Sequence, residues 1–307
     1  MAHPRDISSD TAEKQGAEGL PVGELRVVAT PIGNLADLTP RAREALATAD
    51  VIAAEDTRHT SQLLRHLGID RPMLSLHDHN EMARIPALLA QLKAGACIAL
   101  VSDAGTPLVS DPGSALVAAA VAAGVRVTPL PGASACLAAL CVAGLPADRF
   151  AFEGFLPAKT AARRAALEAL AREPRTLVFY EAPHRIVEAL ADAAQAFGAD
   201  RLAVVARELT KLHETLYRGT LGELAARAPA EPNLARGEMV LLVHGYRTAG
   251  GDDLPAEALR WLRLLLPHLA PSRAAAVVAE GLGLRRQAVY ALALSLASGT
   301  GDDESVE

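Results

Sequence analysis

Two carboxylates directly follow a short apolar run and could supply acid–base chemistry. Glu55 and Asp56 come after the predicted strand 51–54, and Glu181 follows a second predicted strand, 176–180. Open α/β sheets bind ligands at the carboxyl ends of their strands, so these side chains should emerge near a ligand site. They are therefore candidate catalytic groups. Ordinary ion pairing, for example of Asp56 with Arg58, is the alternative interpretation.

Three loops bearing Pro and Gly follow predicted strands of the first half, at 30–35, 102–113 and 129–135. The chain has neither a G-x-G-x-x-G nor a G-x-x-x-x-G-K-[ST] motif after a strand, which disfavours a dinucleotide-binding fingerprint and a P-loop. The loop 102–113 combines backbone donors with carboxylates and hydroxyls, which suits a ligand with ribose hydroxyls and a cationic centre. Turns of this composition also simply terminate strands. The candidate cofactor-binding residues are Thr30, Pro31, Ile32, Gly33, Asn34, Asp103, Ala104, Gly105, Thr106, Ser110, Gly132, Ser134 and, after a later strand, Tyr180.

Alternating strands and helices must position these loops. The pattern predicts an α/β fold of two domains, residues 25–144 with a mainly parallel sheet and 145–246 with a mixed sheet. The expected strands are 25–29, 51–54, 97–102 and 125–129, then 150–155, 176–180, 202–206, 216–219 and 239–243. The expected helices include 41–48, opened by Thr39 and Pro40, as well as 160–172 and 185–197.

A small helical segment, residues 247–300, should follow a turn-rich stretch. Pro271 opens one expected helix, Gly281 to Gly283 turn it, and 285–296 form another. This spacing resembles a helix-turn-helix, although any two short helices joined by a Gly turn give the same pattern.

The net charge of −6 is concentrated in the two tails. Residues 1–24, expected to be disordered, contribute −3 and the acidic tail 301–307 contributes −4, so the body carries about +1. Signal-peptide and membrane-helix patterns are missing, which predicts a soluble, cytoplasmic protein. Cys97, Cys136 and Cys141 have apolar neighbours and should be inert buried thiols.

The ordered motifs resemble the tetrapyrrole methylase superfamily, in particular its branch of small-subunit ribosomal RNA methyltransferases. They are VVATPIGNL (27–35), AAEDTRHT (53–60), LVSDAGTPLVSDPG (100–113), PLPGASA (129–135), FEGFLP (152–157), FYEAPHR (179–185) and RELTKLHE (207–214). The resemblance implies a two-domain fold that binds S-adenosylmethionine in a cleft and usually dimerises. It also implies 2′-O-methylation of a cytidine ribose in 16S rRNA of the 30S subunit.

Methyl transfer from a sulfonium to a hydroxyl needs alignment of the reactants, and a base adds to the rate. Glu55, Asp56 and Glu181 are the candidate bases. No metal is needed, and two histidines at 77 and 79 without a further Cys or His cluster are weak evidence for one. Residues 159–175 carry a local charge of +3 beside the expected cleft. The candidate RNA-binding residues are Arg58, His59, His77, His79, Lys159, Arg163, Arg164, His184, Arg185 and Lys211.

Two other functions remain open from the sequence. One is methylation of a tetrapyrrole, or of a protein side chain as in diphthamide synthesis, by the same superfamily. The loop 30–35 and the EDTRHT segment argue against it. The other is non-enzymatic binding of nucleic acid through the C-terminal helices, with Arg273, Arg285 and Arg286 as phosphate contacts.

Overall fold

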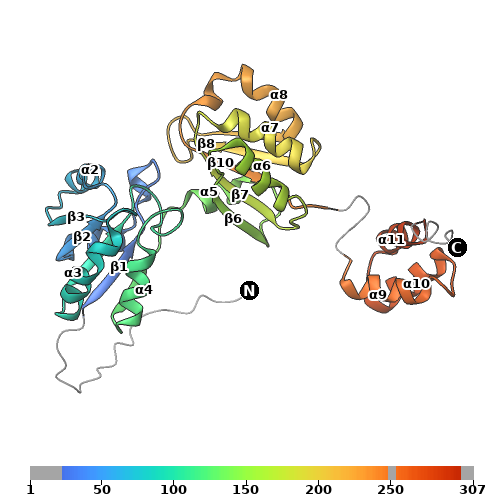
Figure 1. Ribbon diagram of the computed structural model, residues 1–307, viewed down its shortest axis with the longest axis horizontal. Helices are drawn as coiled ribbons and strands as arrows, with labels where there is room; N and C mark the ends of the chain where they lie inside the picture. Colours follow the sequence, from blue (N-terminus) through green and yellow to red (C-terminus); the bar gives the residue numbers. More distant parts are fainter. Residues whose placement is uncertain (1–22, 248–253, 299–307) are drawn as a thin grey trace, which may run out of the picture.

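The computed structural model describes residues 23–247 and 254–298 of the chain. They form two five-stranded sheets with helices packed against them, followed by a group of three helices (Figure 1). The predicted α/β class, parallel first sheet, mixed second sheet and C-terminal helices are confirmed. Of the two predicted tails, only residues 23 and 24 lie within the described residues.

The first sheet is parallel throughout and has the strand order β3-β2-β4-β1-β5. Its strands are β1 (Glu24–Val28), β2 (Val51–Ala54), β3 (Met73–Ser75), β4 (Cys97–Val101) and β5 (Arg126–Leu130). The four predicted strands lie within one residue of these bounds. The edge strand β3 was not predicted, because three residues are too few to show an alternating pattern.

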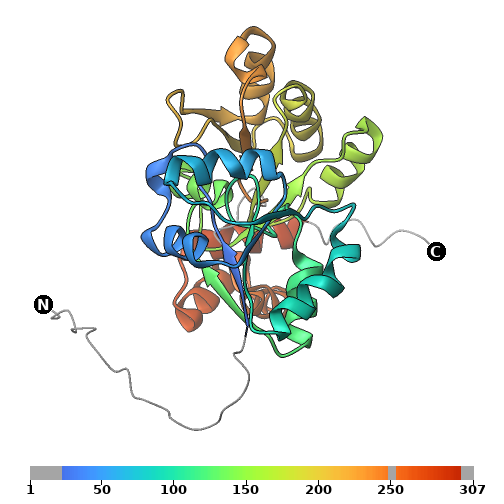
Figure 2. The ribbon, with the colours of Figure 1, turned by 90° about the vertical axis from the view of Figure 1, so that its left-hand side faces the viewer.

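Helices cover both faces of this sheet (Figure 2). They are α1 (Pro40–Thr48), α2 (Thr57–Leu67), α3 (Glu81–Lys93) and α4 (Ser114–Ala122), with a short 3-10 turn, η1 (Leu35–Asp37), before α1. Ile52 packs towards α1 and α2, while its neighbour Ala53 packs towards α3 and α4, as alternation along a strand requires. Thr39 caps α1 by accepting a hydrogen bond from the Ala42 amide, as predicted.

The second sheet has the order β6-β7-β10-β8-β9, in which only β6 and β7 run parallel. Its strands are β6 (Phe150–Phe155), β7 (Thr176–Glu181), β8 (Leu202–Arg207), β9 (Thr215–Thr220) and β10 (Met239–Val243). One face is covered by α6 (Thr160–Ala169), α7 (Ile186–Phe197) and α8 (Leu221–Arg227), with η2 (Ala228–Ala230) and η3 (Pro232–Ala235) behind them.

Helix α5 (Ala135–Ala143) covers the other face of the second sheet, although it precedes the expected domain boundary between residues 144 and 145. Cys136, Ala139 and Leu140 pack there against Val204, Val240 and their neighbours. Gly144 ends the helix in the left-handed region. Cys141 lies on the opposite side of α5 and is exposed, so the prediction that all three thiols are buried was wrong.

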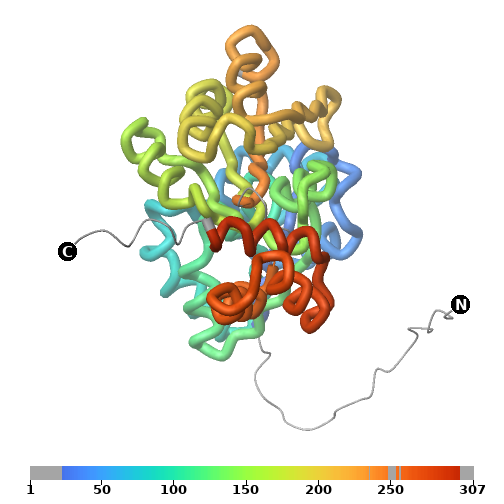
Figure 3. Tube along the Cα trace, turned by 90° about the vertical axis from the view of Figure 1, so that its right-hand side faces the viewer, coloured from blue at the N-terminus to red at the C-terminus, as the bar shows by residue number. Residues whose placement is uncertain are grey.

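The C-terminal helices α9 (Ala256–Leu265), α10 (Pro271–Leu282) and α11 (Arg286–Ser298) share a small core of their own (Figure 3). Leu262, Ala275 and Val289 are fully buried in it. Helix α10 begins at Pro271 as predicted, continues through Gly281 and ends at Leu282, with Gly283 as its C-cap. Helix α9 was not predicted. None of the helices in the described ranges is long and apolar enough to cross a membrane.

Candidate functional site

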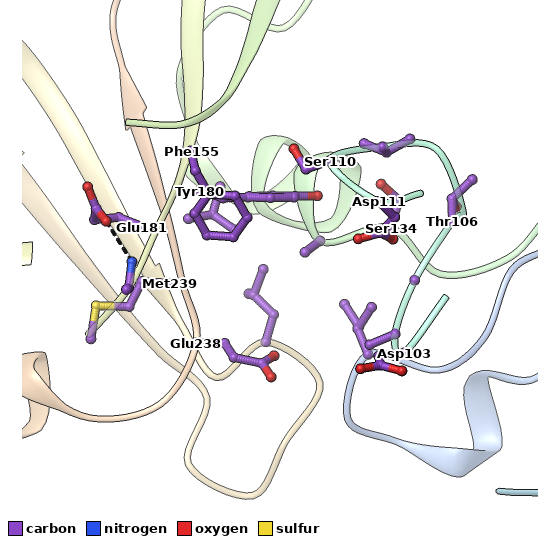
Figure 4. A pocket seen from close by; sticks show the side chains of 18 of the residues that line it. Asp103, Thr106, Ser110, Asp111, Ser134, Phe155, Tyr180, Glu181, Glu238 and Met239 are labelled. Carbon is purple, nitrogen blue, oxygen red and sulfur yellow. Dashed lines mark hydrogen bonds between the residues drawn. The ribbon is translucent and has the colours of Figure 1, made fainter. Parts of the chain in front are cut away.

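A cavity of about 420 Å³ lies where the strand ends of the first sheet meet the second sheet (Figure 4). This volume is typical of small-molecule sites. We call it the first cavity. Ten of its lining residues lie within residues 32–134 and eleven within residues 135–240. They are Ile32, Glu55, Asp103, Ala104, Gly105, Thr106, Val109, Ser110, Asp111 and Ser134, then Ala135, Phe155, Tyr180, Glu181, Ala182, Pro183, Ala206, Leu209, Glu238, Met239 and Val240.

Hydrogen bonds join the three Pro- and Gly-bearing loops of the first half. The Thr30 and Gly105 amides each donate to the other residue's carbonyl oxygen, at 2.8 and 3.0 Å. The Thr106 hydroxyl donates to the Ala133 carbonyl at 3.0 Å. Gly105 has a φ of +84°, and a Cβ there would lie 3.3 Å from Ile32 Cγ2. A glycine therefore keeps this backbone accessible beside the cavity.

The loop after β4 has an unusual backbone conformation where it lines the cavity. Leu108 and Ser110 have φ values of +73° and +67°, which non-glycine residues seldom adopt. Gly154 of β6 faces the same loop, since a Cβ at that position would lie 3.1 Å from Ser110 Oγ. Such conformations persist only where the surroundings enforce them, and they gather at ligand sites.

Three carboxylates follow β2 and β4 as a connected chain. The Asp103 amide donates to Glu55 Oε2 at 3.3 Å, and the Asp56 amide donates to Asp103 Oδ1 at 3.0 Å. Burial raises the pKa of Glu55, and the nearby charge of Asp103 adds to that shift. A carboxylate with a raised pKa is a stronger proton acceptor.

Asp56 has a different environment from Glu55. It caps α2 by accepting from the Arg58 amide at 2.8 Å, and it pairs with the Arg58 guanidinium at 2.6 Å. These hydrogen bonds hold the pKa of Asp56 well below its usual range. Asp56 lines neither cavity described here, so ion pairing, the alternative noted above, describes its environment.

Asp111 and Tyr180 complete the polar lining that Figure 4 labels. Burial raises the pKa of Asp111, and burial raises that of Tyr180 to about 12, so the phenol is neutral at physiological pH. The Tyr180 oxygen accepts from the Cys136 amide at 3.2 Å, and the ring packs edge-on against Phe152 and Phe155. Tyr180 thus connects β7 to the start of α5.

Glu181 is buried, and Arg185 is turned inward towards it. Glu181 Oε1 accepts from the Ala182 amide at 2.7 Å and pairs with Arg185 Nη2 at 2.5 Å. Glu181 Oε2 and Arg185 Nε have no partner among the described residues. Arg185 balances the charge of the Glu181 carboxylate, and its guanidinium group is already held in this ion pair.

A second cavity, of about 340 Å³, adjoins the first. Asp103 lines both cavities. The remaining walls come from the loop after β1, from α2 and from the end of β4. The residues that line it are Thr30, Pro31, Leu35, His59, Thr60, Gln62, Leu63, His66, Ser102 and Asp103.

The loop after β8 reaches the loop after β1 through Lys211. Lys211 Nζ lies 2.9 Å from Glu208 Oε1 and 3.1 Å from Glu238 Oε2. Its aliphatic chain covers Gly33, where a Cβ would lie 2.3 Å from Lys211 Cγ. Glu208 and Thr210 of this loop also have positive φ values, +52° and +65°.

The structure brings most of the predicted cofactor-binding residues together. The first cavity collects Ile32, Asp103, Ala104, Gly105, Thr106, Ser110, Ser134 and Tyr180, along with the candidate bases Glu55 and Glu181. Thr30 and Pro31 line the second cavity instead. Gly33, Asn34 and Gly132 line neither cavity. Asn34 caps η1, and Gly132 makes room for Ala29, whose Cβ would lie 3.0 Å from an added Cβ.

Several lining residues were not predicted. Asp111 lies in the loop 102–113, which the sequence already indicated as a candidate ligand-binding loop. Leu209 lies in the RELTKLHE motif, which was quoted only for the family resemblance. Glu238, Met239 and Val240 carried no signal, because only the pairing of β10 with β7 and β8 brings them to the cavity.

The predicted RNA-binding residues divide by exposure. Arg58, His59, His79, Lys159, Arg164 and His184 are exposed. Arg163 is only 1% exposed, and it pairs with Asp192 at 2.7 Å and Glu188 at 2.9 Å. The inner face of α6 carries it against α7, so it is not available to RNA, and we correct that prediction.

The two histidines singled out in the sequence lie edge to face, with ring centroids 5.9 Å apart. The His77 ring is half-buried beside the Asn80 amide nitrogen, 3.1 Å from His77 Nε2. No group of three or more His, Cys, Asp or Glu side chains suited to a metal occurs within 23–247 and 254–298.

The two sheets and the cavity between them define an α/β protein with a site of small-molecule size. Residues 24–225 match the family of Tetrapyrrole (Corrin/Porphyrin) Methylases, and residues 252–297 match the RsmI C-terminal HTH domain. The chain belongs to the tetrapyrrole methylase family, in the branch whose curated members are named ribosomal RNA small subunit methyltransferase I, as its motifs indicated.

The proteins of that name are similar along most of the chain. The one from Xylella fastidiosa (strain Temecula1) is 56% identical over 268 residues, 87% of this chain and 98% of its own. The one from Escherichia coli O157:H7 is 53% identical over 272 residues, 89% and 95% of the two chains.

Solved structures show the same fold. The methyltransferase CobJ superposes with a TM-score of 0.54 at 23% identity, covering 74% of this chain and 97% of its own. Diphthine synthase superposes with a TM-score of 0.54 at 19% identity, covering 72% and 90%. At these identities the likeness concerns the fold alone.

Proposed function

We propose that this protein methylates the 2′-hydroxyl of a cytidine ribose in 16S rRNA of the small ribosomal subunit, with S-adenosylmethionine as methyl donor. One observation carries the proposal: more than half of the aligned residues are identical to curated small-subunit rRNA methyltransferases along nearly their whole length. We further propose that it acts in the cytoplasm, as a homodimer, on the assembled 30S particle.

The residues of the first cavity fit S-adenosylmethionine. Gly105 leaves its backbone accessible, Tyr180 and Phe155 supply apolar surface, and Asp103 and Asp111 complement a cationic sulfonium. When bound there, the cofactor would supply an electrophilic methyl group. The residues that we propose hold it are Ile32, Asp103, Ala104, Gly105, Thr106, Ser110, Asp111, Ser134 and Tyr180.

Glu55 is the proposed base. Its raised pKa makes it a better proton acceptor than Asp56, and it lines the first cavity beside Asp103. Glu181 is buried and paired with Arg185, so we propose that it orders the cavity wall. Exposed basic residues, Arg58, Lys159, Arg164, His59, His79 and His184, would contact RNA.

The test uses radiolabelled S-adenosylmethionine and 30S subunits that lack the modification. We expect label at the 2′-oxygen of one cytidine, and faster labelling of 30S particles than of naked 16S rRNA. Equal rates on both substrates would refute the requirement for the assembled particle. Cofactor binding without transfer to RNA would refute the proposed substrate and leave a tetrapyrrole or a protein side chain as the acceptor. RNA binding without cofactor binding would instead favour a non-enzymatic role.

A further inference from the structure

The second cavity lies beside the proposed cofactor site and shares one residue, Asp103, with it. In-line methyl transfer requires the acceptor oxygen to be aligned with the donor, so the acceptor must enter a space contiguous with the first cavity. The second cavity is the candidate for that space, because Asp103 lines both cavities. Its volume of about 340 Å³ suits a single nucleoside rather than an extended strand. We infer, on the basis of the proposed function, that it receives the acceptor nucleotide, unstacked from its neighbours.

One residue that lines this cavity, Thr30, carries a hydroxyl that lacks a partner among the described residues. Thr30 is 2% exposed, and its Oγ1 has no hydrogen-bond partner among the described residues. An unsatisfied buried hydroxyl costs free energy, and a hydroxyl can both donate and accept. Because the Oγ1 atom is itself buried, a ribose hydroxyl or a base edge in the cavity would satisfy it after a small displacement of the atoms that cover it. Ser102 and Thr60, also buried, line the same cavity.

The rim has the chemistry that recognises an unstacked base. His59, Gln62 and His66 lie on α2, are exposed and line the cavity. RNA-binding proteins hydrogen-bond the edges of splayed bases and stack rings on them. Leu35 and Leu63 add apolar surface. Arg58, whose side chain is 89% exposed, lies in the first turn of the same helix and could approach a flanking phosphate.

This location changes the role of two residues. Thr30 and Pro31, expected from the sequence to bind the cofactor, line the second cavity and not the first. They would therefore contact the acceptor. Asp103, common to both cavities, would face donor and acceptor together.

The experiment compares variants for two readouts: the dissociation constant for S-adenosylmethionine and kcat/KM for undermethylated 30S subunits. Thr30→Val replaces the hydroxyl with a methyl group of similar shape. We expect at least a tenfold loss of kcat/KM, a cofactor dissociation constant within twofold of wild type and no loss of thermal stability. Thr30→Ser, which keeps the hydroxyl, should recover most of the activity.

Gln62→Ala and His66→Ala test the rim on an exposed helix surface, where folding is not at risk. Each should raise KM for 30S at least fivefold without changing cofactor affinity. The matched control is Arg65→Ala, on the same helix, exposed, and outside the lining of the cavity. It should behave as wild type.

Two outcomes would overturn the inference. One is activity of all lining variants equal to that of Arg65→Ala. The other is a weakening of cofactor binding in parallel with activity, which would make the second cavity part of the cofactor site. Failure of the proposed function is distinguishable, because the wild-type protein would then not label RNA at all.

Discussion

Lys211 lies across the backbone of Gly33, so that a side chain from the second half of the chain covers a loop of the first. A Cβ at Gly33 would lie 2.3 Å from Lys211 Cγ, and the ammonium group beyond is held by Glu208 and Glu238. Because Glu238 lines the first cavity, this contact links the two halves of the molecule beside the proposed cofactor site.

Gly33→Ala should displace Lys211 and weaken its ion pairs. We expect a loss of about 1 kcal/mol in the free energy of unfolding from overpacking, and about fivefold weaker binding of S-adenosylmethionine. In a Lys211→Ala background the same change should cost less, because the clash is gone and only the backbone strain of a side chain at φ +156° remains. Denaturant unfolding and calorimetric titration of the four proteins would measure this coupling. Additive effects would contradict it.

Arg163 and Arg164 are neighbours with opposite environments and provide a matched pair. Arg163→Met removes one of the two arginines that contact the buried Asp192 at 2.7 Å and leaves only Arg164, and we expect it to cost about 3 kcal/mol of stability. Arg164 is 51% exposed, so Arg164→Ala should cost less than about 1 kcal/mol. Urea unfolding measures both. Only Arg164→Ala should weaken binding to 30S subunits at low salt, and the reverse pattern would be incompatible with the burial of Arg163.

Glu55 and Asp111 should make stability fall as pH rises. Burial raises the folded-state pKa of both above their ordinary values of 4.5 and 3.8, so the folded protein retains protons that the unfolded chain has lost. The stability from this source is present below those values and is lost as pH rises through the raised pKa. Glu55→Gln and Asp111→Asn should therefore be more stable than wild type at pH 8 and nearly equal to it at pH 4, in thermal melts.

The same Glu55→Gln variant should lose activity while it gains stability. Removal of a general base lowers kcat by about 10²-fold or more. In the wild type, kcat/KM should rise with pH through the raised pKa of Glu55, and the variant should lack that limb. An unchanged pH profile in Glu55→Gln would exclude Glu55 as the base.

Tyr180→Phe should remove one hydrogen bond and no charge. The phenol accepts from the Cys136 amide, and we expect a cost of about 1 kcal/mol. Because its pKa is raised to about 12, the loss should be constant between pH 6 and 9. Tyr180→Ala, which also removes the ring packed on Phe152 and Phe155, should cost about 3–5 kcal/mol. Denaturant unfolding across that pH range measures both variants.

Much of the fold was predictable because its signals are local. The strands at 51–54, 150–155 and 239–243 appear with the predicted bounds, since apolar runs between turn residues are visible in the chain itself. Thr39 and Pro40 predicted the start of α1 by the same local logic. The edge strand β3 and helix α9 were missed. Helix α5 packs on the second sheet although it lies before the expected domain boundary, because packing depends on which face of a helix meets which sheet.

The sequence by itself determined the family, the strand-end loops and the kinds of residue that line the first cavity, because motifs and turn chemistry are properties of neighbouring residues. Tertiary structure alone decided their surroundings. It separated Glu55, which lines the cavity, from Asp56, which caps a helix, and it buried Arg163 while leaving Arg164 exposed. It also divided the cofactor candidates between two cavities that meet at Asp103. Burial and the pairing of distant strands set these differences, and both depend on residues far apart in the chain.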